Sequence, residues 1–107
     1  MRGAALVCRI AGELDMAMAD QLESTLTGAA AGHPDAPLVL DVREVGFMDS
    51  SGVRALLTIR EALARERRAL VLAELPPAQA KVLRLLSVEA LLPSYPSVTR
   101  ALDALDG

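Results

Sequence analysis

Leu38-Val-Leu-Asp-Val42 is a run of mostly branched apolar residues, and a short distance further on the chain reads Asp49-Ser50-Ser51-Gly52. An apolar run of this kind is typical of a strand that is buried on both faces of a parallel sheet. After Gly52 the apolar residues recur at steps of three and four, which predicts an amphipathic helix that ends near Glu66. These residues are Val53, Leu56, Leu57, Leu63 and Ala64. A buried strand that leads into an amphipathic helix is the repeating unit of an α/β fold.

The same alternation of strand and helix patterns continues on both sides of this stretch. Before and within it, the sequence predicts a strand over 5–11, a turn at Gly12-Glu-Leu-Asp15, a helix over 16–31 with Asp15 as N-cap, a surface loop over 32–37 and a turn over 43–46. After it, the sequence predicts a strand over 69–73, a helix from Pro76-Pro77, a short strand at Leu91 and Leu92, and a closing helix capped by Ser97 that runs to Leu105. This order predicts one α/β domain over residues 1–107, with about four helices packed on a small, mostly parallel sheet.

Composition and charge restrict the class of function. The chain has 107 residues, of which 52% are apolar and 2% aromatic, and its formal net charge is −3. An acidic balance with so few aromatic side chains disfavours nucleic-acid binding. One Cys and one His supply neither an intrachain disulfide nor a structural zinc site, so we expect no metal and no cofactor. The sequence has no stretch of about 18 apolar residues and no signal-peptide cleavage site, so we expect a cytoplasmic protein without direct membrane insertion.

Three other features have structural interpretations. Cys8 lies in a predicted strand, and we expect it to be a core side chain rather than a redox sensor. His33 stands beside Pro34, and we expect it to be a solvated loop residue. The run Arg65-Glu-Arg-Arg68 is expected to be the exposed end of a helix rather than a nucleic-acid patch.

Two segments are similar to those of a known family. Gly12-Glu-Leu-Asp15 and Phe47-Met-Asp-Ser-Ser-Gly52 together resemble the motifs of STAS domains (sulphate transporter and anti-sigma factor antagonist), in particular those of bacterial anti-sigma factor antagonists. The resemblance extends over nearly the whole chain, including Pro93-Ser-Tyr-Pro-Ser97 and the closing amphipathic helix. It implies a STAS-like fold and a role as a regulator of transcription that binds other proteins.

The resemblance also implies how such a regulator is switched. In that family a serine protein kinase, which is also the anti-sigma factor, phosphorylates the Ser that follows the Asp, and by position this residue is Ser50. The unphosphorylated protein is expected to bind the kinase and so release a sigma factor. Phosphorylation is expected to end this binding, and a serine phosphatase to restore it. The resemblance further implies that Asp15 belongs to the partner-facing surface.

The residues themselves suit a switch of this kind. Ser50 lies at a loop-to-helix junction, and the small side chains that follow it leave room for the active site of another protein. A phosphate adds roughly −1.5 to −2 charges, which a helix N-terminus tolerates, while neighbouring carboxylates make the surface more negative. We therefore predict a partner-binding surface that comprises Asp15, Met48, Asp49, Ser50, Ser51, Gly52 and Arg54. The alternative is that Asp49 or Ser50 only caps the helix, and capping is compatible with phosphorylation.

The chain departs from the family pattern at three places. Arg54 stands where the family commonly has a small residue, and its guanidinium could contact a phosphate on Ser50 or a carboxylate of a partner. Ser87-Val88 stands where the third helix is commonly followed by Gly, which we expect to affect only the end of that helix. An N-terminal strand that many relatives have is expected to be missing or very short. Its absence would leave a bare sheet edge that could pair with a second copy in a homodimer.

Two other functions fit a small α/β domain less well. An enzyme is not expected, because Asp49-Ser50-Ser51-Gly52 lacks the first Gly of a nucleophile elbow, the single His lies in a loop, and there is no Gly-rich phosphate loop. The second alternative is a soluble STAS subunit of an ABC-type membrane transport complex, which acts as a constitutive binding module. The Ser at the switch position favours the regulator over this subunit.

Overall fold

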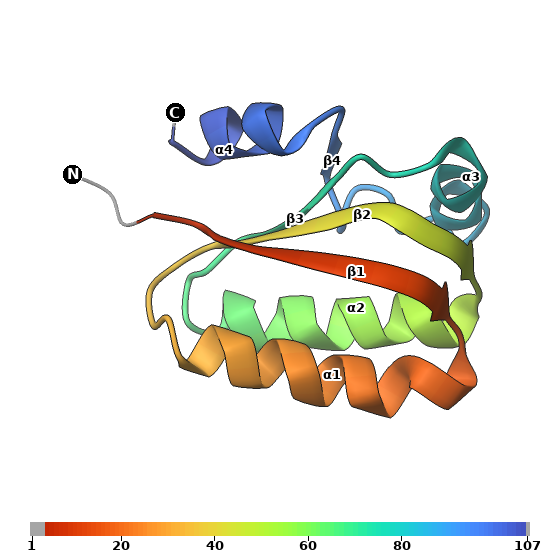
Figure 1. Ribbon diagram of the computed structural model, residues 1–107, viewed down its shortest axis with the longest axis horizontal. Coiled ribbons are helices and arrows are strands. Elements are labelled where there is room, and N and C mark those ends of the chain that lie inside the picture. The colour runs from red at the N-terminus through yellow and green to blue at the C-terminus, as the bar shows by residue number, and fades with distance from the viewer. Residues whose placement is uncertain (1–3, 107) are drawn as a thin grey trace.

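Four parallel strands and four helices alternate along the chain in the computed structural model, which describes residues 4–106 (Figure 1). The elements are β1 (Leu6–Leu14), α1 (Met16–Ala31), β2 (Leu38–Met48), α2 (Ser50–Ala64), β3 (Leu70–Ala73), α3 (Pro77–Leu85), β4 (Ser94–Tyr95) and α4 (Val98–Asp106). The strands lie in the order β1-β2-β3-β4, and every neighbouring pair is parallel. The α/β class and the parallel sheet predicted from the sequence are therefore confirmed, and the sheet is parallel throughout.

The helices divide between the two faces of the sheet. Helices α1 and α2 lie side by side on one face, and α4 lies on the other (Figure 1). The larger core fills the space between the sheet and the α1–α2 pair, with Leu40, Leu56 and Leu72 fully buried in it. A smaller core, in which Val39 and Val71 meet Ala101, lies under α4. Alternate residues of the central strands thus point into different cores, which explains why these strands are apolar along their whole length.

Strands β1 and β2 are longer than the sequence patterns predicted. No turn occurs at 43–46, because β2 continues to Met48 beside β1. The pairing steps from Arg9–Asp41 to Ala11–Glu44, so β2 carries an extra residue there and the strand bends without ending. Strand β1 likewise continues to Leu14 and passes through Gly12, whose φ of 97° lies in the left-handed region. The turn predicted for the whole of 12–15 is therefore confined to its last position.

The last strand and the end of α2 also differ from the predictions. Strand β4 is Ser94–Tyr95, whereas the predicted strand residue Leu92 is buried in the core with 1% of its surface exposed. Ladder pairing reaches this segment because the N–H of Leu72 donates to the carbonyl of Pro93 (2.8 Å). Helix α2 ends at Ala64, two positions before the predicted end, with Arg65 as its C-cap.

Arg68 overturns the expectation that residues 65–68 are simply the exposed end of a helix. Its side chain is buried, and its guanidinium donates to the carbonyl oxygens of Ala36 (2.7 Å), His33 (2.9 Å) and Ala30 (3.1 Å). It also forms an ion pair with Glu66 at 3.0 Å. Burial of the charge is tolerated because carbonyls at the end of α1 and in the following loop need donors. The other three residues of the run are exposed, as predicted.

The remaining structural expectations concern single residues and membrane spans. Cys8 is partly buried and packs against the larger core, and His33 is an exposed loop residue, as the sequence indicated. Burial raises the pKa of the Cys8 thiol. Within residues 4–106, no helix combines the length and the apolar character needed to cross a membrane.

Candidate functional site at the carboxyl ends of β1 and β2

The two sequence motifs meet at one edge of the sheet. Strands β1 and β2 run parallel, and their last residues, Leu14 and Met48, are paired. The N–H of Asp49 donates to the carbonyl of Leu14 (3.2 Å), which holds the two strand ends together. Asp15 and Asp49 are therefore brought to neighbouring positions, each between the end of a strand and the start of a helix. The parallel pairing thus brings together two motifs that are far apart in the sequence.

Both aspartates are helix caps. The carboxylate of Asp15 accepts a hydrogen bond from the N–H of Met18 (3.2 Å). The carboxylate of Asp49 accepts from the N–H groups of Ser51 (2.9 Å) and Gly52 (3.2 Å). Each cap satisfies backbone donors that the first turn of a helix leaves without partners, which is worth about 1 kcal/mol per cap. The predicted N-cap at Asp15 is confirmed, and of the two candidates that the sequence left open for α2, Asp49 rather than Ser50 is the cap.

Ser50 is the first residue of α2, and it is exposed. The helix behind it is 15 residues long and is packed against the sheet, so the hydroxyl stands on a rigid support. A helix N-terminus favours negative charge through its dipole and its unpaired amides. The arrangement can therefore present a hydroxyl to another protein and accept a phosphate without being unfolded by it.

Arg54 lies one turn after Ser50 on the exposed side of α2. Residues four apart on a helix are neighbours on its surface, so the two side chains share one side of the first turns. Arg54 is exposed and forms no ion pair or side-chain hydrogen bond with any residue from 4 to 106. Its guanidinium is thus free to meet an anion supplied from outside or added to Ser50.

Two residues of the predicted partner-binding surface do not face solvent. Met48 is buried, with 3% of its surface exposed, and belongs to the larger core. Gly52 is also buried, and a Cβ atom built on it would lie 2.1 Å from the carbonyl oxygen of Leu14. These two residues hold the strand ends and the start of α2 together. The exposed or partly exposed members of the predicted set are Asp15, Asp49, Ser50, Ser51 and Arg54.

The structure adds two exposed apolar side chains that sequence reasoning did not select. Phe47 is 47% exposed although it precedes the buried Met48, and it pairs with Glu13 of β1. Met16, which follows Asp15 as the first residue of α1, is 77% exposed. Alternation along a strand could have indicated Phe47, since it must point to the face opposite Met48. We call Asp15, Met16, Phe47, Asp49, Ser50, Ser51 and Arg54 the motif surface.

The motif surface has the composition of a protein-binding site. It combines large apolar side chains with two carboxylates, a guanidinium and two hydroxyls. Within residues 4–106, no group of three or more His, Cys, Asp or Glu side chains is placed to hold a metal ion.

Known proteins share the fold of this chain over most of its length. The family model of the STAS domain matches residues 2–101. A crystal structure of an anti-sigma factor antagonist from Mycobacterium paratuberculosis is 29% identical, with a TM-score of 0.82 over 94% of this chain and 85% of that chain.

Two further likenesses are at the level of the fold. The anti-sigma factor antagonist SpoIIAA is 23% identical in both solved forms. Its unphosphorylated form has a TM-score of 0.79 over 100% of this chain and 93% of that chain. The phosphorylated form, from Bacillus, has a TM-score of 0.65 over 92% and 88%. A sulfate transporter family protein from Wolinella succinogenes is 20% identical, with a TM-score of 0.78 over 95% and 84%.

Proposed function

We propose that this chain, which belongs to the STAS domain family, is an anti-sigma factor antagonist whose switch is phosphorylation of Ser50. The observation that carries the proposal is the exposed Ser50 hydroxyl at the start of α2, beside the capping carboxylate of Asp49. The likeness to the mycobacterial antagonist, which spans 94% of this chain, supports it. In the unphosphorylated state the motif surface binds an anti-sigma factor that is also a serine protein kinase, and a sigma factor is released.

Phosphorylation ends this binding through charge at the interface. A phosphate on Ser50 adds roughly −1.5 to −2 charges at neutral pH. It stands next to Asp49 and near Asp15, so the surface becomes strongly negative while α2 keeps its fold. A partner that had covered a neutral hydroxyl then faces a desolvated charge, which costs several kcal/mol when it is unpaired. No rearrangement inside the domain is needed.

Arg54 has a part in the same switch. Its exposed guanidinium lies one turn from Ser50 and has no competing carboxylate within residues 4–106. It is placed to pair with the phosphate, or with a carboxylate of the kinase before phosphorylation. In either case Arg54→Gly changes the affinity for the kinase or the rate of phosphorylation, and a variant that changes neither would remove Arg54 from the switch.

The rest of the proposal follows from the mechanism. The protein acts by binding and is not an enzyme. A serine phosphatase removes the phosphate and returns the protein to the binding state. Binding and dephosphorylation both take place in the cytoplasm, where sigma factors act. One α/β domain over residues 1–107 is sufficient for this role.

The test is tandem mass spectrometry of the protein isolated from its native cells, together with affinity capture by variants. We expect phosphate on Ser50, capture of a serine kinase by Ser50→Ala, and loss of that capture in Ser50→Glu. Ser24→Ala is the matched control, because Ser24 is an exposed hydroxyl on α1 outside the motif surface, and it should behave as wild type.

Two outcomes would contradict the proposal. One is phosphate on Ser51 alone, or on neither residue under any growth or stress condition. The other is capture of an ABC transporter ATPase in place of a kinase, which would establish the alternative role as a constitutive subunit of a transport complex.

A further inference from the structure

The two edges of the sheet differ in their capacity to pair with another strand. Strand β4 has only two residues and is flanked by Pro93 and Pro96, whose missing N–H groups protect an edge. Strand β1 has nine residues, contains no proline, and has no neighbour on its outer side among residues 4–106 (Figure 1). A long edge strand with unpaired backbone groups is a template for pairing.

The backbone of β1 presents every second residue outward. The N–H of Leu6 donates to the carbonyl of Pro37, just before β2, so the backbone groups of Leu6 point toward β2. Groups alternate along a parallel strand, so the N–H and C=O of Val7, Arg9 and Ala11 point away from β2. The side chains of these three residues are exposed, which fits the same alternation.

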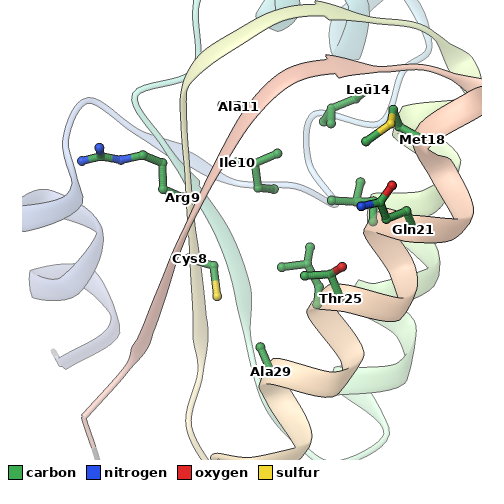
Figure 2. A pocket seen from close by; sticks show the side chains of 11 residues that line it. Cys8, Arg9, Ile10, Ala11, Leu14, Met18, Gln21, Thr25 and Ala29 are labelled. Carbon is green, nitrogen blue, oxygen red and sulfur yellow. The ribbon is translucent and has the colours of Figure 1, made fainter.

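A groove whose lining is uncharged apart from Arg9 lies between this edge and α1. It has a volume of about 430 Å³ and runs along the outer side of the α1–β1 layer. Figure 2 shows Cys8 and Ile10 pointing toward α1 and Arg9 pointing away from it. The facing side of α1 carries Met18, Gln21, Thr25 and Ala29, a stripe without charge over more than two turns.

We propose that a second copy of this chain pairs with β1 in antiparallel orientation, around a twofold axis at Ala11. Outward-facing residues must then oppose each other, and this register places Arg9 of each copy opposite Glu13 of the other. The axis also places Ile10 of each copy opposite Gly12 of the other. The apolar side chains that line the two grooves then lie on the same face of the joined sheet. Ser50 lies on α2 and is no part of the pairing edge, so this contact is separate from the proposed phosphorylation switch.

Neighbouring registers lose this match of charges. With the axis at Ile10, Glu13 opposes Val7 and Arg9 opposes Ala11. With the axis at Arg9, the two guanidiniums oppose each other, which is destabilising. With the axis at Gly12, Arg9 would oppose Asp15 of the other copy, which lies beyond the end of β1 at Leu14, so the two would not be paired within the strands.

The assembly closes at two copies. An isologous contact uses the same patch on both partners, so it consumes both β1 edges. The remaining outer edges are the short, proline-flanked β4 strands, which do not extend the sheet. The product is a continuous eight-stranded sheet in a dimer rather than a fibre, as follows from doubling the four strands of one chain.

The test is sedimentation equilibrium of the whole chain over a concentration series that reaches the sub-millimolar range. Wild type should approach twice the mass of the chain. Arg9→Glu and Glu13→Arg each turn two attractive cross-strand pairs into repulsive ones, so each should weaken the dimer by about tenfold or more. An equal mixture of the two variants restores attraction at both pairs and should form the dimer again.

Controls separate pairing from folding. Glu13→Arg carries the test most cleanly, because Arg9 also lies 3.7 Å from Asp41 in an ion pair within the chain. Ala11→Lys places two ammonium groups at the axis and should abolish the dimer, whereas Ala104→Lys, on the exposed side of α4, should not. Thermal unfolding of each variant verifies the fold. A wild type that is monomeric throughout, or a dimer that survives Ala11→Lys and both charge reversals, would overturn the proposal.

Discussion

A Cβ atom built on Gly52 would lie 2.1 Å from the carbonyl oxygen of Leu14 and 2.7 Å from the Cβ of the same residue. The oxygen belongs to the backbone, so it cannot rotate away as the end of a long side chain could. The same carbonyl accepts the hydrogen bond from Asp49 that joins the two strand ends. A single hydrogen atom in place of a side chain therefore allows α2 to start beside the end of β1, so that Asp15 and Asp49 follow neighbouring strand ends.

We predict that Gly52→Ala lowers the free energy of unfolding by about 3 kcal/mol, because a tightly packed site must move its backbone to admit a methyl group. Urea denaturation followed by circular dichroism measures this change. Gly46→Ala is the control: nothing lies within 4 Å of its Cβ position and its φ is not in the left-handed region, so its stability should stay close to wild type. Equal stability of the two variants would show that the contact with Leu14 is not restrictive.

At the scale of elements, Arg68 joins the beginning of β3 to the segment between α1 and β2. Its guanidinium reaches the carbonyls of Ala30, His33 and Ala36, which are more than 30 positions earlier in the chain (sequence separations of 38, 35 and 32). These carbonyls end α1 and form the loop that leads into β2. The Arg68 side chain thus donates hydrogen bonds to carbonyls at a helix end and in a loop that would otherwise have to be hydrogen-bonded by water.

Replacement of Arg68 by Ala should lower the free energy of unfolding by about 3 kcal/mol, because buried carbonyls lose a charged donor and keep no substitute. Chemical denaturation gives the value, and amide hydrogen exchange should show faster opening at the end of α1. Arg65→Ala, which removes an exposed guanidinium from the same run, should change stability by less than about 0.5 kcal/mol. A similar small change at Arg68 would mean that water replaces its bonds without cost.

At the scale of the whole molecule, stability in acid depends on a carboxylate in the middle of the sheet. Asp41 is buried on β2, where its side chain contacts Arg43 at 3.0 Å and Arg9 of β1 at 3.7 Å. Burial pushes the pKa of Asp41 upward, but the hydrogen bonds from Arg43 and the charges of both arginines outweigh it, so the pKa is held below its ordinary value. The charged form is thus favoured by folding.

A carboxyl whose pKa is lower in the folded state contributes stability above its unfolded pKa and loses it as the pH falls through the folded value. Wild type should therefore be more stable than Asp41→Asn at neutral pH, and this difference in stability should disappear below about pH 4, which is the ordinary pKa of an Asp side chain. Urea midpoints measured from pH 7 to pH 3 provide the comparison, with Asp20→Asn, an exposed change on α1, as the control. A difference between wild type and Asp41→Asn that is constant over this range would contradict the role of the charge.

The alternation of strands and helices, the aspartate caps and the family could all be predicted from the sequence. These features are local: a cap needs only the first turn of its own helix, and the apolar period is set by the element that carries it. The path of β2 through 43–46 was mispredicted because pairing with β1 carries the strand through a local turn signal.

The sequence could not predict which of these residues face solvent, because their exposure depends on the packing of the folded chain. Met48 and Gly52 are buried, Phe47 is exposed, and Arg68 is a buried donor. The physical reason is that each outcome depends on atoms brought from distant parts of the chain: the carbonyl of Leu14 against Gly52, and the end of α1 against Arg68.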